Sequence, residues 1–205
     1  MTASMLDAAL FASVAPCPVN AAPSLEVRVY NHAGVSDGEV TRMTSVAASV
    51  LRRAGIGMIS VVCSPLPDEG VGPAECGTAL GPSDMLLEIL AAPTAPVGRR
   101  ALGLTRPSER SPMMSEVYYS VAIHLAAQPD AVQAPELLGY ALAHEIGHAL
   151  LGAHAHSASG IMAARFSRPQ LEDMARGCLY FSSRQAGRLK QGLRARVTSQ
   201  VACLH

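Results

Sequence analysis

The sequence predicts an α+β fold with an α/β-like N-terminal half and a helical C-terminal part. Residues 25–30 alternate apolar and polar side chains, which is the period of a half-buried strand. Residues 40–54 carry an apolar stripe at helical spacing, and the Ile- and Val-rich run 56–63 predicts a buried strand. A strand, a helix and a strand in this order form a βαβ unit, whose two strands lie parallel. We therefore expect two parallel strands joined by a right-handed helical crossover in this half of the chain.

The remaining elements follow from periodicity and turn residues in the second half of the chain. Pro135 suits the first turn of a long helix that runs to about Leu151, with Leu138 and Leu142 facing the core. Residues 182–185 form a capping box, which predicts the start of a basic amphipathic helix. Further elements are expected as strands over 84–90 and 101–104, as a strand or a helix within 113–124, and as helices over 168–176 and 186–197.

A length of 205 residues fits one domain, or a domain with a small appendage. We expect residues 1–23 to form a leader or a loosely ordered arm, and residues 24–205 to form a single domain. The leader lacks Lys and Arg near its start, and Asp7 interrupts its apolar run, so it is a poor signal peptide. Its Ala-rich composition leaves a degenerate signal open. The protein is secreted or periplasmic if that signal is real, and cytoplasmic otherwise.

Composition argues against two classes of partner. The 16 basic and 16 acidic residues cancel, so no net field favours nucleic acid or an anionic membrane. Only 4% of the residues are aromatic, which argues against base stacking. No stretch approaches the roughly 18 apolar residues of a membrane span, so none is expected. The oligomeric state does not follow from the sequence.

The five cysteines do not have the spacing of a zinc knuckle anywhere in the chain. Cys63 and Cys76 flank a loop rich in Pro and Gly, and they could form a disulfide if the protein is exported. Unpaired thiols in a reducing cytosol are the alternative. The odd number leaves at least one cysteine free or joined to another chain.

The long predicted helix contains a His-Glu-x-x-His motif formed by His144, Glu145 and His148. Because an α-helix repeats every 3.6 residues, the two histidines project from one face. Two imidazoles placed in this way can bind one metal ion, with Glu145 within reach of a metal-bound water. The motif also arises by chance, as two surface or core histidines on a helix. The apolar back of the helix, and His154 and His156 just after it, favour a metal site.

The chemistry of such a site follows from the residue types. Catalytic zinc takes three protein ligands and keeps a fourth position for water. The metal lowers the pKa of that water from 15.7 to about 7. A carboxylate beside the first histidine, here Glu145, can accept the proton of the water and pass it to the leaving amine.

Residues 137–162 resemble the metzincin group of zinc peptidases, within the zincin superfamily. The metzincin pattern is His-Glu-x-x-His-x-x-Gly-x-x-His, followed by a Met-containing turn beneath the metal. His144, Glu145, His148 and Met162 match this pattern directly. The resemblance implies a Zn2+ cofactor, Glu145 as general base, and Met162 as an apolar floor under the imidazoles. It also implies a zincin-like fold in which a small twisted mixed sheet packs on a backing helix and an active-site helix.

The third metal ligand is left open between two histidines. Metzincins have a glycine three residues after the second histidine, whereas here Leu151 takes that place and Gly152 follows. Counting offsets gives His154, but one added helical residue turns the exit of the chain by about 100°. Residues 156–162 are also similar to the endings of small bacterial metzincin-like proteins, which retain the histidine before the Ser-rich turn. We therefore favour His156 and keep His154 as the alternative.

One metzincin feature is missing. Many members carry a Tyr two residues after the turn Met, and this chain has Ala164 there. Tyr140 and Tyr180 are candidates to replace that Tyr, although we expect both to have ordinary packing roles. His32 and His124 stand alone in the sequence and are expected to be surface or hydrogen-bonded histidines, as is His205.

The expected function is that of a zinc-dependent metalloendopeptidase acting on a peptide or protein. An edge strand around residues 113–119 would pair with the extended substrate. Two alternatives stay open. In a gluzincin-type peptidase Glu172 would be the third ligand, and a non-catalytic zinc-binding protein of the same fold would bind metal without cleaving peptides. Glu145 argues against the second alternative, because a structural metal site needs no base.

Overall fold

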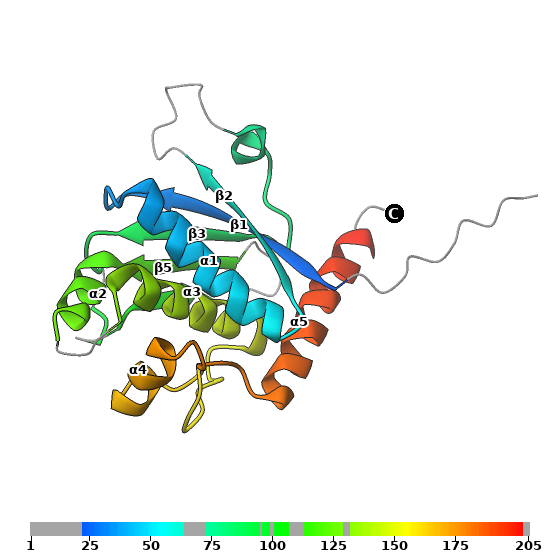
Figure 1. The fold of residues 1–205 in the computed structure, drawn as a ribbon. Coiled ribbons are helices and arrows are strands. Elements are labelled where there is room, and N and C mark those ends of the chain that lie inside the picture. Colours follow the sequence, from blue (N-terminus) through cyan, green and yellow to red (C-terminus); the bar gives the residue numbers. More distant parts are fainter. Residues whose placement is uncertain are drawn as a thin grey trace, which may run out of the picture.

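A five-stranded mixed sheet forms the centre of the computed structural model (Figure 1). The structure describes residues 22–63, 73–94, 96–98, 101–106, 113–128 and 132–202. The sheet has the order β2-β1-β3-β5-β4. Its strands are β1 (Ser24–Asn31), β2 (Gly57–Cys63), β3 (Met85–Leu90), β4 (Gly103–Arg106) and β5 (Met113–Tyr118).

The predicted βαβ unit is confirmed. β1 and β2 are parallel neighbours, and α1 (Asp37–Arg53) connects them. Ser36 and Glu39 form a capping box at the start of α1, and two arginines lie in its last turn, where they complement the helix dipole. β3 and β5 extend the parallel part of the sheet on the other side of β1, and β4 is antiparallel to β5. The fold class is therefore the α+β class that the sequence predicts.

The prediction of an edge strand around residues 113–119 is wrong. Residues 113–118 form β5, which lies between β3 and β4, so the edge strands of the sheet are β2 and β4. Every residue of β5 except Met114 is buried. This burial fits a strand that is paired on both sides. The segment continues directly into α2 (Tyr119–Ala126). Residues 113–124 therefore contain both of the predicted elements, a strand followed by a helix.

Helices α1 and α3 (Ala134–Leu151) lie side by side against the sheet (Figure 1). Gly139 allows their close approach, because a Cβ at this position would lie 2.6 Å from the Met43 carbonyl oxygen. The shared core is made of aliphatic side chains from the sheet and the two helices, among them Val27, Leu51 and Leu142. The chain ends with α4 (Arg168–Ala175) and α5 (Ser183–Ala202), so its C-terminal part is helical as predicted.

A disulfide joins Cys63 at the end of β2 to Cys76 in the short 3-10 helix η1 (Ala74–Gly77). Buried Arg28 holds the same segment against the sheet, since its guanidinium donates to the carbonyl and hydroxyl oxygens of Thr78. Cys178 is a free and exposed thiol. Cys17, Cys203, His205 and nearly all of the predicted leader over 1–23 lie outside the described residues, so the leader stays a prediction.

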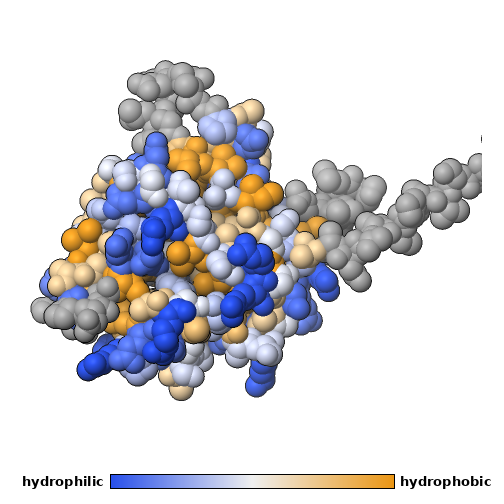
Figure 2. Space-filling view, in the orientation of Figure 1, coloured by the Kyte–Doolittle hydropathy of each residue, from blue (hydrophilic) through white to orange (hydrophobic). Residues whose placement is uncertain are grey.

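None of the described helices is long and apolar enough to cross a membrane. In the view of Figure 2, hydrophilic and hydrophobic residues are intermixed over the surface that carries α1.

Candidate metal centre

Helix α3 positions two of the predicted metal ligands. Gln133 and Glu136 form a capping box at its start, Pro135 lies in its first turn, and Gly152 ends it with a φ of 100°. Nearly the whole helix is buried, which is why its hydrophobic pattern extends beyond a single stripe. His144 and His148 are only 9% and 8% exposed and lie on the same face. Their backbone is therefore fixed by the core of the protein.

Three histidines meet at this face. The Nε2 atoms of His144 and His148 are 2.9 Å apart, and the Nε2 atoms of His148 and His156 are 3.0 Å apart. One ring nitrogen from each of the three lies within 4.8 Å of the others, and such a group could hold a metal ion. His154 is exposed and does not belong to the group.

The hydrogen bonds of the imidazole rings indicate which ring nitrogen carries the hydrogen. His144 Nδ1 is 2.7 Å from the Ile161 carbonyl oxygen, and His148 Nδ1 is 3.3 Å from that of Gly152. A carbonyl only accepts, so each Nδ1 carries the hydrogen, and the tautomer assigned in this way leaves a lone pair on Nε2. Two lone pairs at 2.9 Å repel unless a cation lies between them. The donor set therefore fits a metal ion.

Burial also favours the neutral form of the two helical histidines. It lowers the pKa of His144 to about 4, although the hydrogen bond from Nδ1 to Ile161 opposes this shift. Burial also lowers the pKa of His148. Both imidazoles are thus neutral at physiological pH, and neutral imidazole is the form that binds a metal.

His156 reaches the cluster from an irregular segment, residues 152–163, which we call the histidine loop. Gly152 and Gly160 have φ values of 100° and 74°, in the region that favours glycine. The Ser157 N–H donates to the Met162 carbonyl at 2.8 Å, and the Ile161 N–H donates to the Tyr180 carbonyl at 3.3 Å. These bonds fold the loop back beneath α3.

Met162 is fully buried against α3, next to Gly147, which lies between the two helical histidines. A Cβ on Gly147 would overlap the Met162 Sδ and would lie 3.1 Å from both Met162 Cε and Phe181 Cε1. Gly147 is therefore required by packing at this point of the helix. On the cavity side, the Phe166 ring meets the His144 ring edge to face, with 5.8 Å between the ring centroids.

Glu145 lies beside the histidines and is held by strand β4. The Thr105 hydroxyl donates to Glu145 Oε2 at 2.7 Å, and Ser115 Oγ lies 2.7 Å from the same hydroxyl. Because the Thr105 hydroxyl has one hydrogen, Ser115 must donate to it. Gly103 keeps β4 close, since a Cβ there would lie 2.9 Å from Glu145 Cγ. Burial raises the pKa of Glu145 to about 7, and the Thr105 hydrogen bond opposes the shift.

The three histidines and Glu145 line one cavity of about 540 Å³. One wall is formed by residues 101–105, which include the start of β4, and the other by residues 163–167, which follow Met162. Leu125 of α2 and Ala141 of α3 contribute apolar surface. The volume is within the usual range for a small-molecule or side-chain pocket, about 300–1,000 Å³.

The other residues singled out from the sequence lie elsewhere. Glu172 pairs with Arg168 at 3.0 Å and is not in the histidine cluster. The Tyr140 hydroxyl donates to the Met174 carbonyl at 3.3 Å, and the Tyr180 hydroxyl donates to the Gly177 carbonyl. Neither Tyr lines the cavity. His32 lies 3.7 Å from Glu88, and His124 is exposed on α2.

Sequence reasoning missed Thr105, Ser115, Gly147, Phe166 and the Ile161 carbonyl. Thr105 and Ser115 belong to strands whose pairing brings two hydroxyls together, and no local pattern indicates this. Gly147 offered a signal, because glycine inside a long helix is unfavourable and points to a packing requirement.

Solved structures of zinc peptidases resemble this one. A zinc-dependent peptidase from Methanocorpusculum labreanum superposes with a TM-score of 0.51 at 16% identity, over 80% of this chain and 99% of that chain. Metalloproteinase-II from Bacteroides fragilis gives a TM-score of 0.51 at 15% identity, over 83% of this chain. The chain has a zincin-like fold.

Similarity at this level of identity shows the fold alone. The match spans 53% of the Bacteroides fragilis chain, so this zincin-like chain corresponds to about half of that protein. An archaemetzincin from Methanopyrus kandleri has a TM-score of 0.49 at 18% identity, over 84% of this chain and 97% of its own. No protein-family model and no curated protein sequence matches the chain.

Proposed function

We propose that the protein is a zinc-dependent endopeptidase of the metzincin type. The observation that carries the proposal is that three converging imidazole nitrogens and the Glu145 carboxylate line one cavity. Three histidines and an adjacent carboxylate form a set suited to metal-assisted hydrolysis. The zincin-like fold is consistent with this activity.

In this proposal His144, His148 and His156 hold Zn2+, and Met162 packs beneath their helix. Three protein ligands leave a position for water, which is the arrangement of catalytic rather than structural zinc sites. Bound zinc would lower the pKa of that water toward 7 and polarise the substrate carbonyl. The Ile161 and Gly152 carbonyls keep His144 and His148 in the tautomer that leaves Nε2 free for the metal.

Glu145 has the role of general base and then of general acid. Its carboxylate takes the proton of the attacking water and delivers it to the amine that leaves the cleaved bond. Thr105 holds one carboxylate oxygen, Oε2, which leaves Oε1 to exchange the proton. Because Ser115 fixes the Thr105 hydroxyl in turn, the carboxylate is restrained before substrate arrives.

The substrate is a peptide in extended form. β4 is one of the two edge strands of the sheet and contributes to one wall of the cavity, so a peptide can add to it as a further strand. Backbone hydrogen bonds to β4 would then align the peptide, while the cavity takes one of its side chains. This assigns to β4 the role that the sequence had suggested for residues 113–119.

The test compares wild type with Glu145→Gln for zinc content and for cleavage of a mixed peptide library, followed by mass spectrometry. We expect about one zinc per chain in both proteins. We also expect Glu145→Gln to slow cleavage by about 10²–10⁴-fold, the range for loss of a general acid–base group. A chelator should abolish wild-type cleavage, and added zinc should restore it.

The same experiment separates the alternatives. A protein that binds one zinc but cleaves no peptide, even with Glu145 intact, is a non-catalytic zinc-binding protein. A gluzincin-type peptidase would lose zinc in Glu172→Gln, and we expect that variant to keep it, because Glu172 pairs with Arg168 at a distance from the cluster. If wild type takes up no zinc, the proposal fails.

A further inference from the structure

One charged side chain on the cavity wall has no role in the mechanism above. Arg165 lines the cavity and is exposed, and its neighbour Phe166 is half-buried against His144. Among the described residues that line the cavity, Glu145 is the one acid, and Arg165 is the one guanidinium. Glu145 is buried and bonded to Thr105. The accessible fixed charge of the cavity is therefore positive.

Arg165 also differs from the arginines near it. Arg168 pairs with Glu172 at 3.0 Å, and Arg176 pairs with Asp173 at 2.7 Å. In the part of the chain that the structure describes, Arg165 forms no hydrogen bond and no ion pair. A guanidinium has five donors in a planar fork that matches a carboxylate. The donors of Arg165 are thus free to meet an acceptor that enters the cavity.

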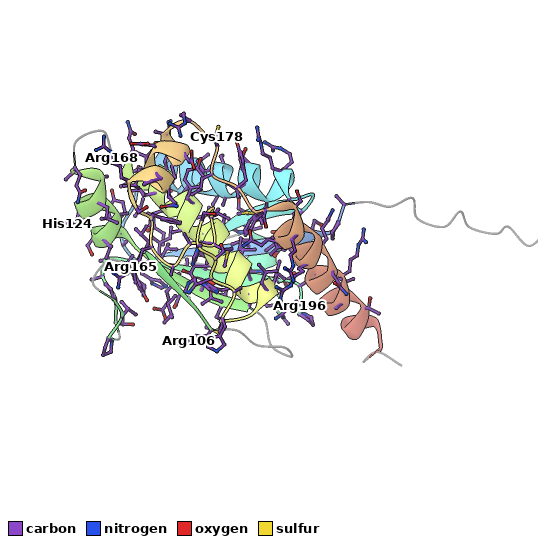
Figure 3. The ribbon with its side chains drawn as sticks, turned by 90° about the horizontal axis from the view of Figure 1, so that it is seen from below. Arg106, His124, Arg165, Arg168, Cys178 and Arg196 are labelled. Carbon is purple, nitrogen blue, oxygen red and sulfur yellow. A yellow bond between two sulfur atoms is a disulfide. The ribbon has the colours of Figure 1, made fainter. Side chains whose placement is uncertain are left out.

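The surroundings of Arg165 define what such a ligand looks like. Figure 3 shows Arg165 on the same side of the molecule as His124 of α2, and the next residue of that helix, Leu125, lines the cavity. Leu125, Ala141 and Phe166 provide apolar surface, which suits the stem of a side chain. An apolar stem that ends in a carboxylate matches both the apolar surface and the guanidinium.

We propose that Arg165 makes this site selective for peptides that bring a carboxylate into the cavity beside the metal centre. The inference rests on the peptidase function proposed above and names its substrate class. The carboxylate has two sources, an Asp or Glu side chain or the free C-terminus of a short peptide. Either forms two parallel charge-assisted hydrogen bonds with a guanidinium.

The size of the effect follows from the partial exposure of Arg165. A hydrogen bond to a charged group is strong when buried, whereas a fully exposed ion pair contributes little. A partly enclosed cavity lies between these cases, so we expect a preference of about tenfold for the carboxylate over a neutral isostere. The preference should shrink at high ionic strength, because salt screens exposed charges.

The test measures binding rather than turnover. Zinc-loaded, full-length Glu145→Gln, which we expect to be almost inactive, is titrated with fluorescent peptides that differ in one position, Glu or Gln, and in a free or amidated C-terminus. The Glu and Gln are placed at each position in turn. A preference of about tenfold for Glu over Gln at one position shows that the carboxylate comes from a side chain. The same preference for the free over the amidated C-terminus shows that it comes from the end of the peptide.

Three further variants assign the preference to a residue. Arg165→Met should reduce the preference to less than about twofold, and Arg165→Glu should invert it toward a Lys-containing peptide. Arg168→Met is the matched control, because Arg168 does not line the cavity, and it should keep the preference. Zinc content and the melting temperature of each variant are measured alongside.

Two results would overturn the inference. The first is that the parent protein, Glu145→Gln, binds neutral and carboxylate peptides equally well. The second is that the preference for the carboxylate survives in Arg165→Met. If wild type still cleaves neutral peptides in either case, the proposed peptidase function stands and the assignment of Arg165 alone fails. If wild type cleaves no peptide and the zinc-loaded parent binds none, both proposals fail together.

Discussion

Helix α3 and the histidine loop supply the three imidazoles in different ways. In α3 the spacing of His144 and His148 is a property of the helix itself, because residues four apart share a face. In the histidine loop, by contrast, His156 is placed by two left-handed glycines and by hydrogen bonds from Ser157 and Ile161. The helix presents its two histidines by local geometry, whereas the loop places His156 through contacts with the rest of the chain.

The difference shows why only part of such a site can be predicted from the local sequence. A helical pair is encoded by local sequence and is supported by a buried core, so its geometry is rigid before metal binds. The position of a histidine in a loop depends on the backbone conformation, so the sequence alone leaves several residues as candidates for the third position. Substitutions in the loop should therefore test which histidine completes the proposed metal site.

The largest expected effect separates the two histidines of the loop. His156→Ala should lower zinc affinity by more than about 100-fold, since even loss of an outer hydrogen bond to a ligand costs about 10–100-fold. His154→Ala should keep about one zinc per chain, because His154 lies outside the cluster. Zinc stoichiometry and competition with a chromogenic chelator measure both. Equal affinities in the two variants would show that His156 is not a ligand.

The next effect concerns Glu145, the proposed general base, which α3 carries and Thr105 of β4 holds. Thr105→Val removes the hydroxyl that donates to Glu145 Oε2 and keeps the shape of the side chain. A hydrogen bond to a charged group contributes about 1.5–3 kcal/mol, so peptide cleavage should fall by about 10–100-fold. Zinc content should not change.

Thr105→Ser is the control for this prediction, because it keeps the hydroxyl and should recover most of the rate. A rate for Thr105→Val within about twofold of wild type would mean that α3 alone orients Glu145. A loss of zinc in Thr105→Val would instead mean that the hydroxyl supports the metal site.

The sequence predicted the parts of the fold that follow from periodicity. The βαβ unit, the long helix and the helical C-terminal part rest on repeats of two or 3.6 residues. The order of β4 and β5 could not be predicted, because strand order depends on pairing between segments distant along the chain. For the same reason Thr105 gave no signal, since it meets Glu145 only after β4 pairs with β5 and packs on α3.

The third expected effect tests the backbone of the histidine loop. Gly152 has φ 100° and ψ 161°, a region that is open essentially to glycine alone. Gly152→Ala should lower the free energy of unfolding by about 1–3 kcal/mol, and it should also weaken zinc binding, because the Gly152 carbonyl accepts from His148. Chemical denaturation with and without zinc separates the two losses. A variant as stable as wild type would show that the loop tolerates another conformation.

The smallest effect compares glycines inside two helices. Gly187 of α5 has nothing within 4 Å of an added Cβ, so Gly187→Ala should stabilise the protein by about 0.5–1 kcal/mol through helix propensity. Gly147→Ala has the same gain in α3, but its Cβ overlaps the buried Met162 Sδ. Overpacking costs about 1–3 kcal/mol, so the net change should be a loss of up to about 2 kcal/mol.

A second substitution shows whether Met162 is the cause of that loss. In a Met162→Ala background the overlap with Met162 Sδ is gone and the 3.1 Å contact with Phe181 Cε1 remains, so Gly147→Ala should destabilise that background less than it destabilises wild type. Thermal unfolding of the four proteins in this cycle gives the coupling energy between the two positions. A coupling near zero would mean that α3 and the turn beneath it are independent, and that the spacing of the helix alone determines the geometry of its two histidines.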